Sequence, residues 1–523
     1  MKCYEGTILS VNSNDDVFRY LVEDRGRIVF VGNDLPVEYK NMERTVLGER
    51  ALIPAFVDSH QHFASFSTFL AGLNLMGAES NAEMMEMISD FAGQSKKNTL
   101  ICFGASPYSV KEGRLISREE LDSVCPDKEI MVVKYDGHAC IVNTKLLNKL
   151  KNKVKDLRGY HPDTGEMNQE TFFRCSDYLS GTLSLTELFG NMMDAVDYMA
   201  SKGIGMVHTV SGVGFPMNMD ITLEKIFAKS LENGFQLRVF PQPMDINVAL
   251  KRKIPRIGGC FESALDGCFG SHDAAMIQPY TDEAGGNGVL YYSDEKVTEF
   301  CKAANRAGLQ IEMHAIGDRA FDQACRALKA ALDDHPRKDH RHGIIHDCLP
   351  TEEGIRICKE YGILMPVQSA FINWEQEPDE YLESIMGRER SSRLNPIKTF
   401  RDNAIVVSFG SDAPCTSPDP IVWIDRAVNN PNKNEAVTVQ DALKMCTYNG
   451  YFTTFDDKER GSLETGKVAD MVILSCDPYG IPKEDISNLK VEKLILSGKE
   501  YQSAKRSVAK AMFDGITDRN SSF

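Results

Sequence analysis

The sequence predicts an α/β protein built on a (β/α)8 barrel, a TIM-like fold in which eight parallel strands alternate with helices. Three observations support this prediction: a strand-and-helix rhythm through the middle of the chain, β-rich segments at both ends, and one long stretch that does not fit the rhythm. A chain of 523 residues is also long enough for a large catalytic barrel with a smaller accessory domain.

Short strands dominate both ends of the chain. The segments rich in β-forming residues are separated by turn residues and cover residues 6–11, 20–23, 27–31, 467–474 and 491–496. We therefore predict a small β-sandwich domain formed by residues 1–53 together with 455–503. The last segment, 504–523, is typical of a C-terminal helix followed by a tail.

The middle of the chain repeats a short apolar strand followed by a helical pattern, such as the patterns at 293–307 and 318–333. Alternation of this kind indicates parallel strands joined by crossover helices. Eight strands are the number that a closed barrel needs, and its active site lies at their C-terminal ends. The barrel is predicted over 54–454, with strands at 55–60, 205–210, 236–241, 259–263, 310–314, 343–346, 363–368 and 405–410.

The stretch from about 64 to 200 is too long for one crossover between the first two barrel strands. It contains strand-like segments at 100–105 and 129–134, so we predict an insertion with a structure of its own. An insertion beside the mouth of a barrel can form a lid or a wall of the substrate site.

The composition disfavours several classes of function. The formal net charge of −16 disfavours binding to nucleic acid, because a negative surface repels phosphates. The 14 cysteines contain no CxxC pair, and no segment has the pattern of a signal peptide or the roughly 20 apolar residues of a membrane helix. We expect a cytoplasmic protein with a small-molecule substrate and neither a nucleic-acid nor a membrane partner; a homodimer is common among barrel proteins.

Four histidines and one aspartate stand at the ends of predicted barrel strands. His60 and His62 are two residues apart, so on a strand their side chains point to the same side. His314 and His346 each end another strand, and Asp412 follows the last one. Neutral imidazole and carboxylate are ligands of zinc and related metals. A single histidine at such a position is usually an ordinary polar residue, but the set indicates a metal centre.

Several motifs, which follow one another along the chain, resemble those of a known group of proteins. They are IPAFVDSHQH at 53–62, DGHACIVN at 136–143, LDGCFGSHDAA at 265–275, HAIGDRA at 314–320, HGIIH at 342–346, GSDAP at 410–414 and GSLETGKVAD at 461–470. Together they resemble the YtcJ-like group of the amidohydrolase superfamily (amidohydrolase family 3), which includes N-substituted formamide deformylases.

The resemblance implies roles for these residues. His60 and His62 would bind the more buried metal together with Asp412, and His314 and His346 would bind the second. Many relatives bridge the two ions with a carboxylated lysine, and Glu262 occupies the aligned position, four residues before Asp266. We therefore expect Glu262 to bridge two zinc ions, although manganese, iron or cobalt could use the same ligands. A Glu262 that points away would leave a mononuclear site.

The expected reaction is hydrolysis of an amide or related C–N bond by a metal-activated hydroxide. Asp412 would act as the general base and then as the acid. His138 matches a histidine that lies near the substrate in relatives, which makes it a second candidate catalytic residue.

Two alternatives remain at this stage. One is a mononuclear deaminase of a ring amine, which would use the same histidines and Asp412 without a bridge. The other is a non-catalytic metal-binding regulatory protein, although none of the six expected ligands is missing from the sequence. The sequence lacks GxSxG, P-loop and HExxH motifs, which disfavours other familiar chemistries.

Overall fold

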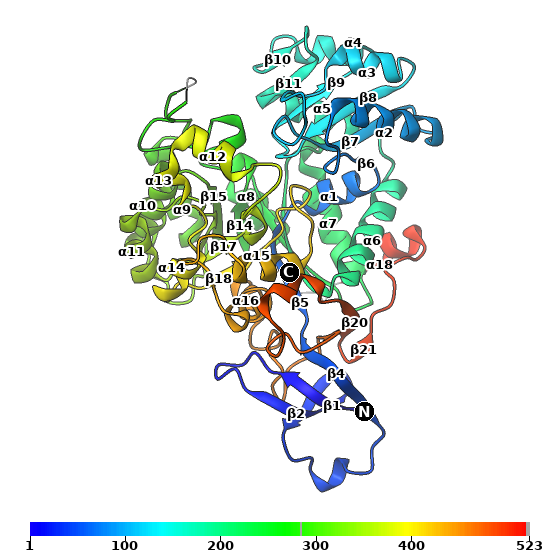
Figure 1. Cartoon of the computed structure of the whole chain (residues 1–523), viewed down its shortest axis with the longest axis vertical. Coiled ribbons are helices and arrows are strands. Elements are labelled where there is room, and N and C mark those ends of the chain that lie inside the picture. Colours follow the sequence, from blue (N-terminus) through cyan, green and yellow to red (C-terminus); the bar gives the residue numbers. More distant parts are fainter. Residues whose placement is uncertain (283–284, 519–523) are drawn as a thin grey trace.

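The computed structural model describes residues 1–282 and 285–518. Three parts follow one another along the longest axis of the molecule (Figure 1). A sheet built from both chain ends lies at one end, a body of alternating strands and helices lies in the middle, and a second sheet lies at the other end. The mixed α/β class predicted from the sequence is confirmed.

The body contains eight parallel strands. They are β5 (Phe56–Gln61), β12 (Ile204–Ser211), β13 (Gln236–Pro241), β14 (Arg256–Gly259), β15 (Gln310–Ala315), β16 (Gly343–His346), β17 (Met365–Val367) and β18 (Val407–Phe409). Hydrogen bonds join them into three short sheets, β13-β12-β5, β14-β15-β16 and β17-β18.

Contacts between these sheets show that the eight strands lie side by side in the same order as they occur in the sequence. Strand β13 lies beside β14, a bridge between Gly343 and Leu364 joins β16 to the start of β17, and β18 lies beside β5. This is the neighbour order that an eight-stranded parallel barrel requires. Strand β14 lies earlier than predicted, because it runs from Arg256 to Gly259 and shares only Gly259 with the predicted strand over 259–263.

Amphipathic helices cover these strands. Helix α10 (Asp318–Asp334) buries Phe321, Ala324 and Leu328, which recur at the three- and four-residue spacing of one helical face. Complete burial of a side chain such as Phe321 stabilises the fold by about 1.5–3 kcal/mol. The other helices around the body include α1 (Phe63–Leu70), α6 (Leu185–Ser201), α7 (Met219–Ser230), α9 (Asp294–Arg306), α11 (Glu352–Tyr361) and α15 (Pro420–Val428).

The two ends of the chain share one seven-stranded sheet of order β21-β20-β19-β4-β1-β2-β3. An antiparallel bridge between Arg27 and Val468 brings the β3 edge back beside the segment that leads into β19, so the sheet curls around its own apolar core. The hydrogen bonding therefore joins all seven strands into one curled sheet. The strands are β1 (Lys2–Leu9), β2 (Val17–Asp24), β3 (Arg27–Gly32), β4 (Arg44–Pro54), β19 (Met471–Leu474), β20 (Val491–Leu496) and β21 (Lys499–Glu500).

The insertion forms a six-stranded sheet of order β10-β11-β9-β8-β7-β6. Separate apolar clusters lie around it, one with Ile88 and Leu121 and another with Leu146 and Phe172, so this part has a core of its own. The elements are β6 (Leu73–Asn74), α2 (Asn81–Gln94), β7 (Thr99–Ala105), α3 (Arg118–Val124), β8 (Glu129–Lys134), β9 (Ala139–Val142), α4 (Thr144–Val154), β10 (Tyr160–His161), β11 (Glu166–Asn168) and α5 (Gln169–Ser180).

Helix α18 (Val508–Thr517) packs against α7 near the end of the chain. The predicted tail beyond it, residues 519–523, lies outside the described residues. Among the residues that are described, no helix combines the length and the apolar character needed to cross a membrane.

Candidate metal centre

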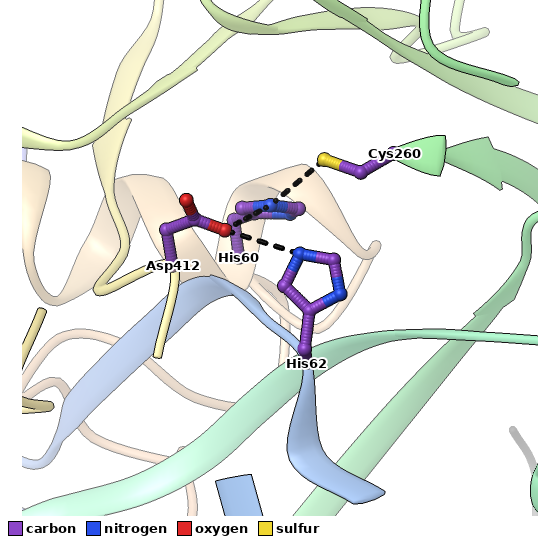
Figure 2. A group of neighbouring side chains, drawn as sticks. All are labelled: His60, His62, Cys260 and Asp412. Atoms are coloured by element: carbon purple, nitrogen blue, oxygen red, sulfur yellow. Dashed lines mark hydrogen bonds and ion pairs between the residues drawn. The ribbon is translucent and has the colours of Figure 1, made fainter. Parts of the chain in front are cut away.

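The C-terminal ends of the body strands bring His60, His62, Cys260 and Asp412 together (Figure 2). The Asp412 Oδ1 atom lies 3.1 Å from His60 Nε2 and 3.2 Å from His62 Nε2, and Cys260 Sγ lies 3.3 Å from His60 Nε2. All four side chains are buried. One carboxylate, two imidazoles and one thiol thus face one another with little exposure to solvent.

A second group consists of Cys260, His314 and His346. Cys260 Sγ lies 3.5 Å from His346 Nε2, and the rings of His314 and His346 are 4.5 Å apart between centroids. Within each group the atoms that could bind a metal all lie within 4.8 Å of one another. Cys260 belongs to both groups, so its sulfur stands where one ligand could serve two ions.

Neighbouring acceptors orient the imidazoles of the second group. The Gln368 Oε1 atom accepts a hydrogen bond from His346 Nδ1 at 2.5 Å, which leaves the Nε2 lone pair of His346 facing Cys260. His314 Nε2 donates to the Gly267 carbonyl at 3.2 Å, with Asp266 Oδ1 at 3.4 Å. The remaining nitrogen, His314 Nδ1, is buried without a partner among the described residues. Such outer contacts fix which ring nitrogen is free to bind a metal.

Burial and the neighbouring charges set the protonation of the cluster. Burial lowers the pKa of both His60 and His346, so these imidazoles are held in the neutral form that binds metals. Burial opposes ionisation of Asp412, but hydrogen bonds from His60 and His62 outweigh it and hold the pKa of Asp412 well below its ordinary value. Burial raises the pKa of the Cys260 thiol, which would lose its proton on binding a cation.

Contacts between β5 and the loop after β18 fix the position of Asp412. The Asp58 carboxylate accepts hydrogen bonds from the backbone N–H and the hydroxyl of Ser411, at 2.9 Å and 2.5 Å. The Asp412 N–H donates to the His60 carbonyl at 2.9 Å. Gly410 allows this close approach, because a Cβ atom there would lie 2.5 Å from the His60 nitrogen. The backbone of Asp412 has a φ of +55°, in the left-handed region that is uncommon for residues other than glycine.

Glu262, the expected bridging ligand, does not join either group. Strand β14 ends at Gly259, Phe261 has a φ of +48°, and residues Phe261–Ser263 form a short 3-10 turn. The two-residue alternation of a strand is therefore lost, and the Glu262 side chain does not share the direction of Cys260. Glu262 is exposed, and its carbonyl accepts a hydrogen bond from the Tyr292 hydroxyl at 2.7 Å. The position between the two groups is occupied by the Cys260 thiol instead of the Glu262 carboxylate.

A pocket with largely aromatic walls opens onto the cluster. His62, Cys260, His314, His346 and Asp412 all line it. The insertion and the body both contribute aromatic side chains to the walls, among them Phe103, Phe172, Phe173, Phe261, Phe269, Phe371 and Trp374. The insertion therefore forms part of the wall of this pocket.

His138, the second predicted catalytic residue, lines the same pocket without belonging to either metal-ligand group. Its ring lies 5.6 Å from that of Phe261, which in turn lies 4.9 Å from the ring of His62. His138 is therefore placed where a bound substrate could reach it.

Sequence reasoning missed Cys260 and the orienting role of Gln368. The signal for Cys260 was its place directly after Gly258-Gly259, within the predicted strand over 259–263. Gln368 offered no comparable signal, since its role depends on the ring of His346 that packs beside it.

Comparison with known proteins identifies the family of the chain. A family model described as the amidohydrolase family matches residues 47–501. The chain is 24% identical over 483 residues to YtcJ, a Bacillus subtilis (strain 168) protein assigned by name to the amidohydrolases, covering 87% of this chain and 90% of YtcJ. It is 22% identical over 551 residues to an N-substituted formamide deformylase of Arthrobacter pascens, covering 94% and 96% of the two chains.

The structure is similar to that of an uncharacterized metal-dependent hydrolase from Pyrococcus furiosus. The TM-score is 0.73 at 23% identity, and the match covers 91% of this chain and 99% of the other. At this identity the likeness supports the fold alone. The match to the family model, in contrast, extends over most of the sequence. The chain therefore belongs to the amidohydrolase family.

Proposed function

We propose that this protein hydrolyses an amide or related C–N bond of a small molecule, with Asp412 as the general base and then the general acid. The observation that carries the proposal is that two groups of buried metal-ligand side chains share Cys260. Members of both groups, Asp412 among them, line one pocket. The similarity to a formamide deformylase directs attention to N-formyl and N-acyl amines as substrates.

The side chains present fit divalent metal ions. His60, His62, Cys260 and Asp412 would hold one ion, and Cys260, His314 and His346 would hold a second. Imidazole, thiolate and carboxylate are the ligands that zinc prefers, and the unpartnered Nδ1 of His314 is a further sign that a partner belongs there. A bound divalent ion supplies Lewis acidity, which polarises a carbonyl and lowers the pKa of water to about 7.

The residues of the chain supply the proton transfers and the surroundings. Asp412 lines the pocket beside His60 and His62, so its carboxylate can accept a proton from the attacking water and deliver it to the leaving nitrogen. His138 lines the pocket, where it can donate a hydrogen bond to the substrate oxygen as negative charge develops there. The aromatic walls limit the access of bulk water and accept an apolar substituent of the substrate.

The test is a screen of the zinc-loaded protein against N-formyl and N-acyl benzylamines, with release of the free amine as the readout. We expect Asp412→Asn to lower kcat by about 10²- to 10⁴-fold, the usual contribution of general acid–base catalysis. Asp419→Asn is the matched control, because Asp419 caps helix α15 a short distance along the chain and asparagine caps helices equally well.

Metal content must be measured for both variants, because Asp412 also belongs to the first ligand group. Full turnover by metal-loaded Asp412→Asn would refute the assignment of the base. Failure of the fully loaded wild-type protein to release amine from any member of the panel would contradict the proposed substrate class.

A further inference from the structure

A second polar group lies on the pocket wall, apart from the metal-ligand groups, and consists of Lys134, Asp136 and Glu377. Lys134 Nζ pairs with Asp136 Oδ2 at 2.8 Å and donates a hydrogen bond to the Gly270 carbonyl at 3.0 Å. All three residues are less than a tenth exposed: 6% for Lys134, 8% for Asp136 and 9% for Glu377. Asp136 and Glu377 both line the pocket.

The Glu377 carboxyl is held by one of its two oxygens. Its Oε1 atom accepts a hydrogen bond from the Tyr135 hydroxyl at 2.7 Å and another from the Gly270 N–H at 3.0 Å. Both contacts use Oε1, so the carboxyl is fixed in orientation while Oε2 keeps its capacity to accept hydrogen bonds. Glu377 lines the pocket and its hydrogen bonds within the described residues use Oε1, so a bound molecule could bond to Oε2.

The charges of this group do not balance. It contains two carboxyls and one ammonium, and the ammonium of Lys134 is paired with Asp136. Among the described residues Glu377 takes part in no ion pair. Burial, reinforced by the nearby Asp136, raises the pKa of Glu377 to about 7. A buried carboxylate without a counter-charge is costly, so this position favours a cationic or hydrogen-bond-donating partner.

A run of aromatic rings leads from the metal-ligand cluster to Glu377. The His346 ring stacks on Phe371 with centroids 6.0 Å apart, and Phe371 stacks on Trp374 at 4.9 Å. The Trp374 ring lies 5.2 Å from that of Tyr135, whose hydroxyl is bonded to Glu377. A substrate lying along this wall would have one end at the metal-ligand cluster and the other near the carboxyl.

We propose that Glu377 is a specificity-determining residue that binds an ammonium or N–H group at the far end of an aromatic or apolar substrate, whose scissile amide lies beside His346. The substrate class is therefore a mono-acylated diamine, or a comparable amide with a basic nitrogen, separated from the amide by an aromatic body. The ring of Trp374 adds a surface on which a cation is attracted by the π system. This inference rests on the proposed function for the position of the scissile bond, but the binding of the cation can be tested without catalysis.

The first experiment compares the binding of benzylammonium and benzyl alcohol to zinc-loaded protein at pH 7.5, followed by tryptophan fluorescence. Trp374 lines the pocket, and the only other tryptophan, Trp423, is fully buried. We expect the wild-type protein to bind the cation about tenfold to a hundredfold more tightly than the alcohol, the usual worth of a charged hydrogen bond. Absence of this preference in the wild type overturns the proposal without any variant.

The variant Glu377→Gln keeps an oxygen for Tyr135 and Gly270 while removing the charge, so it should abolish the preference for the cation. Glu375→Gln is the matched control, because Glu375 lies two residues away with a side chain that is 81% exposed, and it should leave the preference unchanged. An undiminished preference in correctly folded Glu377→Gln refutes the assignment.

A second experiment measures hydrolysis of N-formyl-4-(aminomethyl)benzylamine against N-formyl-4-ethylbenzylamine, which has the same shape without the basic nitrogen. We expect the wild type to favour the first substrate through a lower KM and Glu377→Gln to lose this advantage. Equal KM values for the two substrates in the wild type contradict the specificity role. If the wild type hydrolyses neither, the proposed function fails, while the binding experiment still decides the role of Glu377.

Discussion

Replacement of Cys260 by alanine should reduce the zinc content from two ions per chain to one. The first ligand group has four members and the second has three, with the Cys260 sulfur common to both. Without this sulfur, three donors remain in the first group but only His314 and His346 in the second. Three protein ligands suffice for a catalytic zinc site, whereas two do not form a stable one. Cys260→Ser should behave in the same way, because a serine hydroxyl does not ionise readily.

The loss of one ion also has a thermodynamic signature. An ion present at 100 times its dissociation constant stabilises the native state by about 2.7 kcal/mol. With an unfolding entropy of ~2.1 cal/mol/K per residue, this amounts to a shift in Tm of about 2–3 °C for a chain of 523 residues. The quantity to compare is the difference between metal-loaded and metal-free Tm for each variant, since this difference cancels the packing change caused by the substitution itself.

The assay is metal analysis by plasma mass spectrometry after chelation, reconstitution with zinc and removal of excess metal. Reconstitution with cobalt adds a thiolate-to-metal charge-transfer band, which should disappear in Cys260→Ser. The control Cys415→Ser, which changes another buried thiol of the same pocket, should keep this band, and Glu262→Ala should keep both ions. Two ions in Cys260→Ala, or the loss of one in Glu262→Ala, would refute the reasoning and restore Glu262 as the bridge.

Three further changes test other parts of the structure. Asp266→Asn should weaken binding of the second zinc by about 10- to 100-fold, because the Asp266 carboxylate contacts the ring of His314 and helps to orient it. Competition with a chromophoric chelator measures this affinity, and an unchanged value would contradict the role of Asp266. Burial and the nearby Arg256 lower the pKa of His208 to about 3. Neutral His208 therefore contributes fully to stability above about pH 6.5, and this contribution is lost as the pH falls toward 3. The free energy of unfolding should change by up to about 1.4 kcal/mol per pH unit in this range. Denaturant unfolding between pH 4 and 7 should show a smaller slope for His208→Gln than for the wild type or for the exposed control His335→Gln, and equal slopes would exclude His208 as the source. Gly410→Ala should lower both Tm and zinc content, because the added Cβ meets the backbone of β5 at 2.5 Å; a variant with normal zinc content would show that the two strands can separate without cost to the site.

Much of the site followed from the sequence because its members stand at one kind of position. His60, His314 and His346 lie at or near the C-terminal ends of parallel strands, and such ends meet at one face of the body. Periodicity and strand order were therefore sufficient to predict that these side chains lie close together. Strands β7 and β8 of the insertion were also recognisable, since β8 is buried throughout and β7 over most of its length. Strands such as β10 and β11, with two and three residues, are too short to leave a periodic pattern.

The bridging position shows where reasoning from pattern reaches its limit. A predicted strand over 259–263 would give Cys260 and Glu262 the same direction, and chemistry would then favour the carboxylate. The direction of a side chain depends on the backbone of its own residue and its neighbours, and the positive φ of Phe261 separates the two. A positive φ in a phenylalanine is not encoded by local preference, so it must be imposed by tertiary contacts. Phe261 packs against His62, which follows β5, and against His138 and Phe173 of the insertion. The insertion thus forms a wall of the pocket and also supplies contacts to the residue whose conformation separates Cys260 from Glu262.

For this reason we expect Phe173→Ala, a change in the insertion, to alter the zinc content as well as the binding of apolar substrates. Unchanged zinc content in that variant would mean that the turn at Phe261 is maintained by the body of the protein alone.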